Sequence, residues 1–428
     1  MDKLIDQKSY QKKLLLNLKV GSFLARREVR RSNPWTTILI IFVMTLTFLN
    51  LVVVSGILVG LIEGSEEANR ERYTSDVILS PLPEREYIRD STRIEKEIKK
   101  APGYAMSTSR YVLSGTVVSN YKDTLRKDEK NNISGGSIVG INPELEDQIT
   151  HISETVIEGE YLTSSDSDKI MIGKDLLYQY TPIDSPGFSV LKDVGVGSRV
   201  LVRVGDSERE MFVKGILKSK AGEVDARIFM TASEARKLGG RSDLNVDEIA
   251  VELAPGYSVE AFRDYLLEKG FGDNARIQTW EDAQPKFLKD IKTTFALLGN
   301  MISSIGLVVA SITIFIVIFV NAITRRRYIG ILKGVGVTKG AIEISYVLQA
   351  LFYAISGVLI GTLLVFLVLK PAIYANPIDF PFSDGILVAT ALGTFFRAVI
   401  LFLATLVAGY IPAYIVIKQN TLDAILGR

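Results

Sequence analysis

The sequence has no cysteine and a single histidine, His151, among its 428 residues. Without cysteine, the chain can form no disulfide, thiolate metal site or cysteine nucleophile. The lone histidine also excludes a multi-histidine metal site and a histidine-dependent catalytic triad within the chain. We expect His151 to be a surface or turn residue. We predict no metal ligand, cofactor-binding residue or catalytic residue in this chain.

Charge is missing from long parts of the sequence. A helix needs about 20 apolar residues to cross a bilayer, and four runs are long enough: 36–62, 293–323, 344–369 and 385–417. The first run begins too late and is too long for a cleaved signal peptide, so we expect an anchor. None of the four contains Asp or Glu, which argues against coupling to protons or sodium. The sequence therefore predicts a polytopic membrane protein with four transmembrane helices.

A nucleotide-binding motif is also missing. No segment fits the P-loop pattern G-x-x-x-x-G-K-[ST], whose backbone cradles phosphates. The formal net charge is only +2, so no global field indicates nucleic acid as a partner. Energy for work across the membrane would therefore enter through another chain. We expect this chain not to be an enzyme, because no catalytic constellation supports that class.

Basic residues beside the spans predict the orientation, because short cytoplasmic segments are enriched in Lys and Arg. The segment 371–384 has neither residue type. The positive residues instead lie before the first span, between the second and third, and after the fourth: Arg26, Arg27, Arg30, Arg31, Arg325, Arg326, Arg327, Lys333, Lys339, Lys418 and Arg428. We expect the N-terminus (1–35), the loop 324–343 and the C-terminus (418–428) to be cytoplasmic. The segments 63–292 and 370–384 are then outside.

The segment 14–31 mixes apolar and basic residues, which is typical of a helix at the cytoplasmic face of the membrane. A simple positive anchor for topology explains it equally well.

The segment 63–292 has the composition of a soluble domain. Its two flanks, 63–130 and 242–292, each fit a strand–helix–strand order, while 131–241 consists mostly of short β-rich runs. The expected flank elements are strands at 76–80, 111–119, 248–253 and 276–279 and helices at 89–100 and 259–269. We infer an extracytoplasmic α+β domain with an α/β part and an inserted β-rich part. One continuous α+β domain is the alternative.

The loop after the second span, from Arg325 to Val337, is R-R-R-Y-I-G-I-L-K-G-V-G-V. It resembles the signature E-R-x-x-E-I-G-x-L-K-A-x-G-A of ABC transporter permeases of the MacB/LolC/FtsX type. The segment from Pro412 to Ile425 resembles that family's terminal P-A-x-x-A-A-x-x-x-P-x-E-A-L. Segments 139–144 and 170–176 are similar to its extracytoplasmic domain. The resemblance covers nearly the whole chain.

The chain departs from the family pattern at several positions. The two loop glutamates of the signature fall on Thr324 and Tyr328, and its alanine on Gly334. Near the C-terminus, Thr421 replaces a proline and Asp423 replaces a glutamate. Acidic contacts to an ATPase are therefore partly missing or moved.

The resemblance implies a type VII permease that works by mechanotransmission, without a fused ATPase domain and with a porter-like α/β part. Two copies of an ABC ATPase subunit would bind ATP and Mg. A second permease subunit, identical or homologous, and membrane lipids would complete the complex, together with an extracytoplasmic adaptor or lipoprotein. The expected location is a prokaryotic cytoplasmic (inner) membrane, and the expected task is lipoprotein extraction or export of a small molecule or peptide.

A different class of function remains open. The chain could be a transmembrane signalling or scaffold protein of the FtsX kind that regulates an extracytoplasmic hydrolase. The length of 63–292 favours transport, because an FtsX-like outside domain would be much shorter.

By the same resemblance, the loop 324–343 would couple the membrane helices to the ATPase. We expect Ile329, Ile331 and Leu332 to enter a groove on the partner, while the arginines stay at the lipid surface. Glycines permit a tight exit from a short helix. The alternative is a basic topogenic loop with a flexible turn. The predicted coupling residues are Arg327, Ile329, Gly330, Ile331, Leu332, Lys333, Gly334, Gly336 and Asp423.

Arg397 is the one charged residue inside the four apolar runs, about twelve residues into the fourth. A charge at membrane depth is costly unless it is paired or hydrated. We hypothesise that Arg397 faces a helix interface or a water-accessible cavity. Snorkelling, or a span that starts later than expected, are the alternatives.

Overall fold

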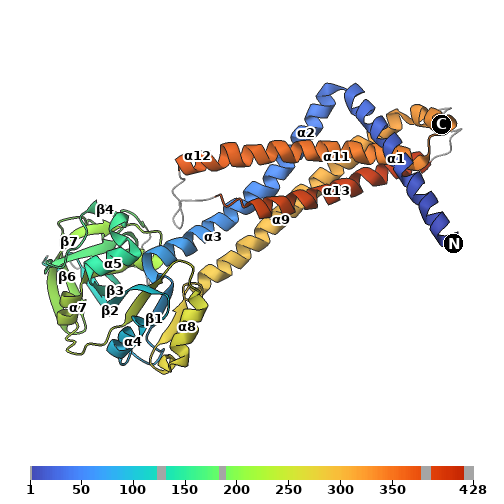
Figure 1. The fold of residues 1–428 in the computed structure, drawn as a ribbon. Helices are drawn as coiled ribbons and strands as arrows, with labels where there is room; N and C mark the ends of the chain where they lie inside the picture. Colours follow the sequence, from blue (N-terminus) through green and yellow to red (C-terminus); the bar gives the residue numbers. More distant parts are fainter. Residues whose placement is uncertain (1, 123–131, 183–188, 377–386, 419–428) are drawn as a thin grey trace. The chain divides into compact units, whose positions relative to one another are not determined.

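A computed structural model of the chain describes residues 2–122, 132–182, 189–376 and 387–418. It divides into two compact units. The membrane unit comprises Met1–Leu61, Ile291–Ile378 and Asp384–Arg428, and the α/β unit comprises Ile62–Asp290 with Asp379–Ser383. Figure 1 labels their helices and strands.

Four helical segments in the described part of the chain are long and apolar enough to cross a membrane: Pro34–Thr74, Lys286–Thr324, Lys339–Ala375 and Ala391–Lys418. The predicted number and order of spans are therefore confirmed. The first segment contains α2 (Pro34–Leu49), η1 (Asn50–Val54), α3 (Ser55–Asn69) and η2 (Arg70–Thr74). The second is α9 (Lys286–Thr324) and the fourth is α13 (Ala391–Lys418). The third contains α11 (Lys339–Leu363), η6 (Leu364–Leu369) and α12 (Lys370–Ala375).

The ends of the helices differ from the ends of the apolar runs. The first three segments extend beyond the apolar runs 36–62, 293–323 and 344–369. An apolar run gives only the part of a helix that fits inside the bilayer, whereas the backbone hydrogen bonds of the helix can continue past it. The fourth helix starts at Ala391 instead of 385. Residues 377–386, which include part of the predicted loop 370–384, lie outside the described residues.

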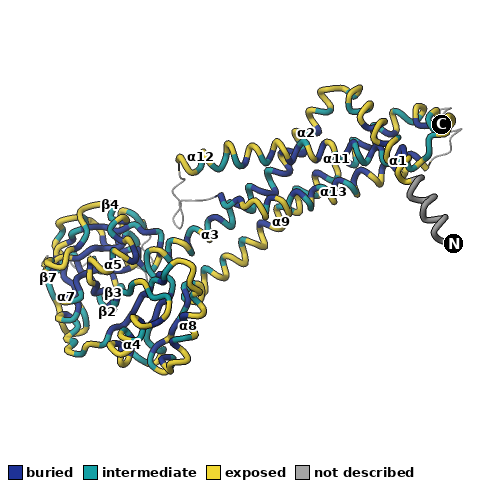
Figure 2. The backbone as a smooth tube through the Cα atoms, in the orientation of Figure 1, coloured by how far each residue is buried: buried dark blue, intermediate teal, exposed yellow. Residues whose placement is uncertain are grey.

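Helix α11 is the central helix of the membrane unit and packs against α1 (Asp2–Arg31), α2 and α13. Its contacts to α2 involve glycines one turn apart, Gly357 and Gly361. A Cβ atom built on Gly357 would lie 2.6 Å from Met44 Cβ, and one on Gly361 would lie 2.5 Å from Phe48 Cδ1. Small residues four apart let two membrane helices approach closely. By contrast, long stretches of α9 are exposed in Figure 2.

The close approach at Gly357 leads to a stability prediction. We expect Gly357→Ala to lower the free energy of unfolding of the membrane unit by about 1–3 kcal/mol, because a side chain forced into a filled space costs about that much. Gly299→Ala is the matched control, since its Cβ would meet Leu58 Cδ1 at an ordinary 3.4 Å. Thermal unfolding of the detergent-solubilised protein measures both. Equal midpoints for the two variants would contradict this packing.

Helix α1 includes the predicted segment 14–31 and lies along the first turns of α11. A Cβ on Gly21 would be 2.9 Å from the carbonyl oxygen of Ala341, and Thr338 Oγ1 donates to Asn17 Oδ1 at 2.6 Å. The predicted helix is therefore present, and one face of it is covered by protein. Its position at a lipid surface stays a prediction.

The α/β unit is built on a ten-stranded sheet with the order β10-β1-β9-β2-β3-β8-β5-β7-β4. Strand β6 lies off this path and pairs with both β2 and β7. The strands are β1 (Val77–Ser80), β2 (Tyr104–Val118), β3 (Ile133–Ile141), β4 (Val156–Gly159), β5 (Lys169–Gly173), β6 (Arg199–Val204), β7 (Ser207–Leu217), β8 (Arg227–Thr231), β9 (Glu248–Leu253) and β10 (Arg276–Thr279).

Strand β2 belongs to two parts of this sheet. Its first half, up to Arg110, pairs antiparallel with β9, which is followed by β1 and β10. From Tyr111 onward β2 pairs with β3, and its end also pairs with β6. Because β6 returns to β7, the pairings β2-β3-β8-β5-β7-β6 close into a ring. The flanks thus form one open part, and the middle of the domain forms a closed β part.

Helices cover both parts. The helices are α4 (Ser91–Ile98), α5 (Pro143–Thr150), α6 (Gly222–Asp225), α7 (Ala232–Leu238) and α8 (Val259–Glu268), with short 3-10 turns η3 (Ile152–Thr155), η4 (Lys174–Leu176) and η5 (Phe271–Asp273). Buried Ile94, Ile98, Phe262 and Leu266 on α4 and α8 join the main core with β1 and β9. Strands β5, β8 and β9 are mostly buried, whereas β4 is mostly exposed (Figure 2).

Most of the expected flank elements are present, but the expected strand 111–119 was too short. The structure extends it back to Tyr104. The residues 105–109 are small or polar and give no strong strand pattern, whereas hydrogen bonds to β9 determine their conformation. The expected helix 89–100 is shorter, and Asp90 lies in the left-handed region just before it.

Candidate functional site

The loop between the second and third spans forms a short helix, α10 (Arg326–Gly334). Helix α9 ends at Thr324, and Arg325 leaves helical geometry at φ −102° and ψ 13°. After α10, Gly336 takes φ +99°, a conformation that favours glycine. Thr338 then caps α11, where its Oγ1 accepts a hydrogen bond from the Ala341 N–H at 3.3 Å. The loop is thus a defined helix held between two sharp turns.

The two faces of α10 differ in burial. Ile329 is only 2% exposed and belongs to the core of the membrane unit, and Leu332 packs against that core. The prediction that Ile329 enters a partner's groove is therefore wrong, because its side chain already fills a space in this chain. Exposed residues one helical turn apart form the opposite side, here called the outer face of α10: Arg327, Tyr328, Ile331 and Val335. Ile331 is 53% exposed and Val335 is 80% exposed.

The other predicted coupling residues hold α10 in place or form its exit. Gly330 is buried, and Lys333 Nζ donates to the carbonyl oxygen of Ile417 on α13. Burial and the nearby charge of Lys339 lower the pKa of Lys333. Gly334 and Gly336 adjoin open space. Asp423 lies outside the described residues.

Two residues that the sequence did not indicate anchor this loop to other helices. Glu28 on α1 forms an ion pair with Arg325, with 3.3 Å between Oε1 and Nη1. Its second oxygen accepts a hydrogen bond from Gln349 Nε2 of α11 at 3.1 Å. Both partners lie far from Glu28 in the sequence, so no local pattern could predict the pairing. A polar glutamine inside an apolar run was the only available signal.

Arg397 lies in the second turn of α13, since that helix begins at Ala391. Its Nη2 donates to Ser55 Oγ, the first residue of α3, at 2.7 Å. The residue thus faces a neighbouring helix. It is also closer to the helix end than the expected start at 385 indicated.

In the α/β unit, five side chains form a buried ionic group at the point where β2 changes partners. We call it the joint cluster: Tyr73, Arg110, Glu146, Arg227 and Glu248. Arg110 is 1% exposed. Its Nη2 donates to Glu146 Oε1 at 2.7 Å and to the carbonyl oxygen of Tyr73 at 2.7 Å. Its Nη1 donates to Glu248 Oε2 at 3.2 Å.

Tyr73 connects this cluster to the helix of the first span, because it lies in η2. Its hydroxyl donates to Glu248 Oε1 at 2.9 Å and accepts from Arg227 Nη2 at 3.0 Å. The remaining members come from β2, α5, β8 and β9. Asn142 positions the α5 member, because its Oδ1 caps that helix by accepting from the Leu145 N–H at 3.2 Å. The cluster therefore joins the end of η2 to both parts of the sheet.

The two arginines of the joint cluster favour the ionised form of Glu248. Burial opposes the charge of Glu248, but Arg227 and Arg110 outweigh it and lower the pKa of this carboxyl. The hydroxyl of Tyr73 donates to Glu248 and accepts from Arg227. The two arginines of the cluster thus pair with its two acidic side chains.

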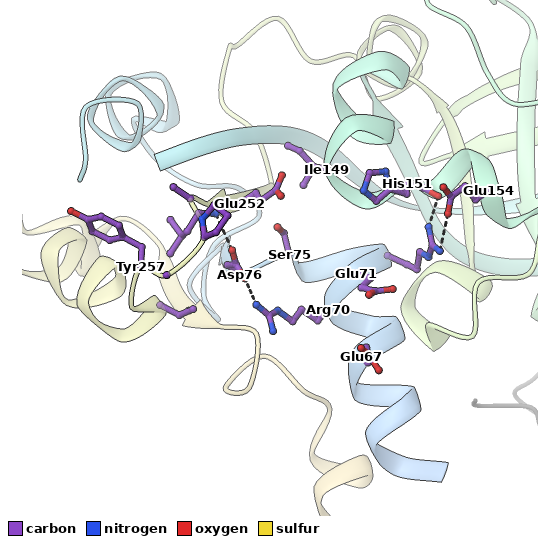
Figure 3. A pocket seen from close by; sticks show the side chains of 16 residues that line it. Glu67, Arg70, Glu71, Ser75, Asp76, Ile149, His151, Glu154, Glu252 and Tyr257 are labelled. Atoms are coloured by element: carbon purple, nitrogen blue, oxygen red, sulfur yellow. Dashed lines mark hydrogen bonds and ion pairs between the residues drawn. The ribbon is translucent and has the colours of Figure 1, made fainter. Parts of the chain in front are cut away.

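A polar hollow of about 540 Å³ lies beside η2 (Figure 3). Arg70 pairs with Asp76 at 2.6 Å, and Arg72 pairs with Glu154 at 3.1 Å and donates to the carbonyl oxygen of His151 at 2.6 Å. His151 itself occupies a left-handed turn at the end of α5. Among the described residues, no group of three or more His, Asp or Glu could hold a metal ion. These ion pairs fix the end of η2 to the domain.

Two family models match the chain. The model described as MacB-like periplasmic core domain matches residues 37–269, and the model described as FtsX-like permease C-terminal matches residues 300–421. No curated protein gives a significant sequence match.

Among solved structures, the chain is similar to the periplasmic region of MacB from Actinobacillus actinomycetemcomitans, with 12% identity, a TM-score of 0.34, and coverage of 50% of this chain and 92% of that one. It is also similar to the extracellular domain of the noncanonic ABC-type transporter YknZ from Gram-positive bacteria. That comparison gives 15% identity, a TM-score of 0.30, and coverage of 48% and 98%.

Proposed function

Because the chain belongs to the MacB/FtsX-type family of ABC transporter permeases, we propose that it couples ATP hydrolysis by a separate ATPase subunit to movement of its α/β unit. It is a membrane subunit of an ABC-type transporter. The ATPase would be present in two copies and would bind ATP and Mg. A second permease subunit, identical or homologous, would complete the membrane part.

The observation that supports this proposal most is the division of α10 into two faces. Buried Ile329 and the bond from Lys333 to α13 make α10 part of the membrane unit. Exposed Ile331 and Val335 present apolar surface outward. An exposed apolar group with a charged rim is typical of a protein-binding site. A partner that pushes on this outer face would move the helices to which α10 is fixed.

Two helical segments contain residues of both units: Pro34–Thr74 and α9. Helix α9 extends over 39 residues, and one residue, Arg325, separates it from α10. The first segment, Pro34–Thr74, ends at the joint cluster, where Tyr73 is bound by Arg110 and Arg227. Displacement of η2 would therefore move both parts of the sheet together. This mechanism would require no substrate channel through the bilayer.

In the proposed orientation, both termini and α10 are cytoplasmic, and the α/β unit is outside an inner membrane. The arrangement fits lipoprotein extraction or export of a small molecule or peptide from the outside space. An adaptor or lipoprotein would then contact the α/β unit.

Co-purification tests the proposal. The detergent-extracted chain is expressed with each ABC ATPase encoded beside its gene, and ATP hydrolysis of the purified complex is measured. We expect one ATPase to remain bound through size-exclusion chromatography and to hydrolyse ATP. If the folded chain retains no ATPase but binds a hydrolase encoded nearby, the proposal fails and the scaffold function replaces it.

A further inference from the structure

Two adjoining hollows lie on the surface of α1 in the membrane unit. One, of about 720 Å³, is lined by Phe23, Arg26, Arg27, Arg30 and Arg31. The other, of about 340 Å³, is lined by Leu24, Arg27, Glu28, Arg31, Arg325 and Tyr328. Arg27 and Arg31 line both, so the hollows form one strongly basic surface.

The positive charge of this surface is not neutralised by the described side chains. Glu28 is the only acidic residue in either lining, and it already pairs with Arg325 and accepts from Gln349. Arg26, Arg27, Arg30 and Arg31 are all exposed and form no ion pair with any side chain that the structure describes. Guanidinium groups bind phosphate oxygens in a bidentate manner. The surface therefore suits a phosphate group.

Apolar side chains continue from these hollows along the first span. Phe23 is 64% exposed beside the arginines, and Trp35, at the start of α2, is 79% exposed. Ile38 and Leu39 follow at 57% and 61%. Tryptophan at this position is typical of a membrane–water interface. A ligand with both a phosphate and acyl chains matches this order of basic and apolar residues better than a free anion does.

We propose that Arg27 and Arg31 bind the headgroup phosphate of an anionic phospholipid, whose acyl chains lie against the apolar side of α2. The site adjoins the proposed ATPase contact, because Tyr328 of the outer face of α10 lines one of the hollows. Occupancy by lipid would thus fill the space between α1 and the start of α10.

Native mass spectrometry of the full-length protein in detergent tests this site. Dioleoylphosphatidylglycerol is titrated against the wild type, an Arg27→Gln/Arg31→Gln variant, and an Arg89→Gln/Arg93→Gln variant. The last loses the same charge from exposed arginines of the α/β unit. We expect at least a tenfold loss of affinity in the first variant and none in the second. Thermal midpoints without added lipid establish that both variants are folded.

Three results would overturn the proposal. Dioleoylphosphatidylcholine binding as tightly as the anionic lipid would show no headgroup selection. Displacement of the lipid by inorganic phosphate at similar concentration would indicate a site for a free anion. Unchanged lipid affinity in Arg27→Gln/Arg31→Gln would show that these two arginines do not bind the lipid. None of these readouts from the isolated chain depends on the proposed function.

Discussion

Arg110→Leu is expected to lower the free energy of unfolding of the α/β unit by about 3–5 kcal/mol, the usual cost of removing one partner from a buried ion pair. The guanidinium of Arg110 compensates Glu146 and contributes to the compensation of Glu248. Without it, Glu146 would lose its ion-pair partner in a site that is 1% exposed. The carbonyl oxygen of Tyr73 would also lose its donor.

The measurement uses urea unfolding of the detergent-solubilised chain, followed by fluorescence of Trp280 in a Trp35→Phe background. These are the only two tryptophans in the sequence, so the signal reports on the α/β unit. Arg203→Leu is the control, because its pair with Glu208 is half exposed on both sides. Exposed pairs contribute about 0–1 kcal/mol. If both variants lose the same small amount, the joint cluster does not hold the domain together.

Ile331→Asp combined with Val335→Asp is expected to weaken binding of the ATPase at least about 30-fold, because loss of a central apolar contact costs about 2 kcal/mol or more. Both side chains are exposed, so the change should not disturb the membrane unit. Affinity is measured by titrating labelled ATPase onto the purified chain.

Two further variants separate this effect from general damage. Leu244→Asp places the same charge on an exposed residue of the α/β unit, where Leu244 is 66% exposed, and should leave affinity unchanged. Ile329→Asp should instead reduce folding yield, since Ile329 is buried in the core. Wild-type affinity in Ile331→Asp/Val335→Asp would show that the ATPase binds elsewhere.

Much of the architecture could be predicted from the sequence, because the membrane imposes simple patterns. Four long apolar runs predicted four spans, and the change of composition at 63–292 predicted the domain between the first two. The division of that domain into two parts could also be predicted, since strand and helix patterns differ between its flanks and its middle. The closure of the β part through β6 could not be predicted from the sequence, because strand partners are determined by contacts between residues distant in the sequence.

The candidate site shows a similar limit. The loop motif predicted a short helix with an apolar side, but not which apolar residues point outward. Ile329 and Ile331 are alike in type, and only the packing of α10 on the bundle separates them. Arg110 lies just before the expected strand 111–119 and Glu248 begins the expected strand 248–253, and no local pattern indicates that their charges are buried. Their burial depends on η2, α5 and β8, which meet only in the folded chain.

Thiol cross-linking gives the most direct test of the claim that α10 transmits force from an ATPase. The chain has no cysteine, so Ile331→Cys and Leu244→Cys each provide one reactive thiol. Membranes containing each variant and the ATPase are treated with a short thiol-to-amine cross-linker, and adducts are identified by mass spectrometry. We predict an ATPase adduct from residue 331 that changes in yield with ATP, and none from residue 244. An adduct from residue 244 alone would contradict both the proposed coupling site and the proposed orientation.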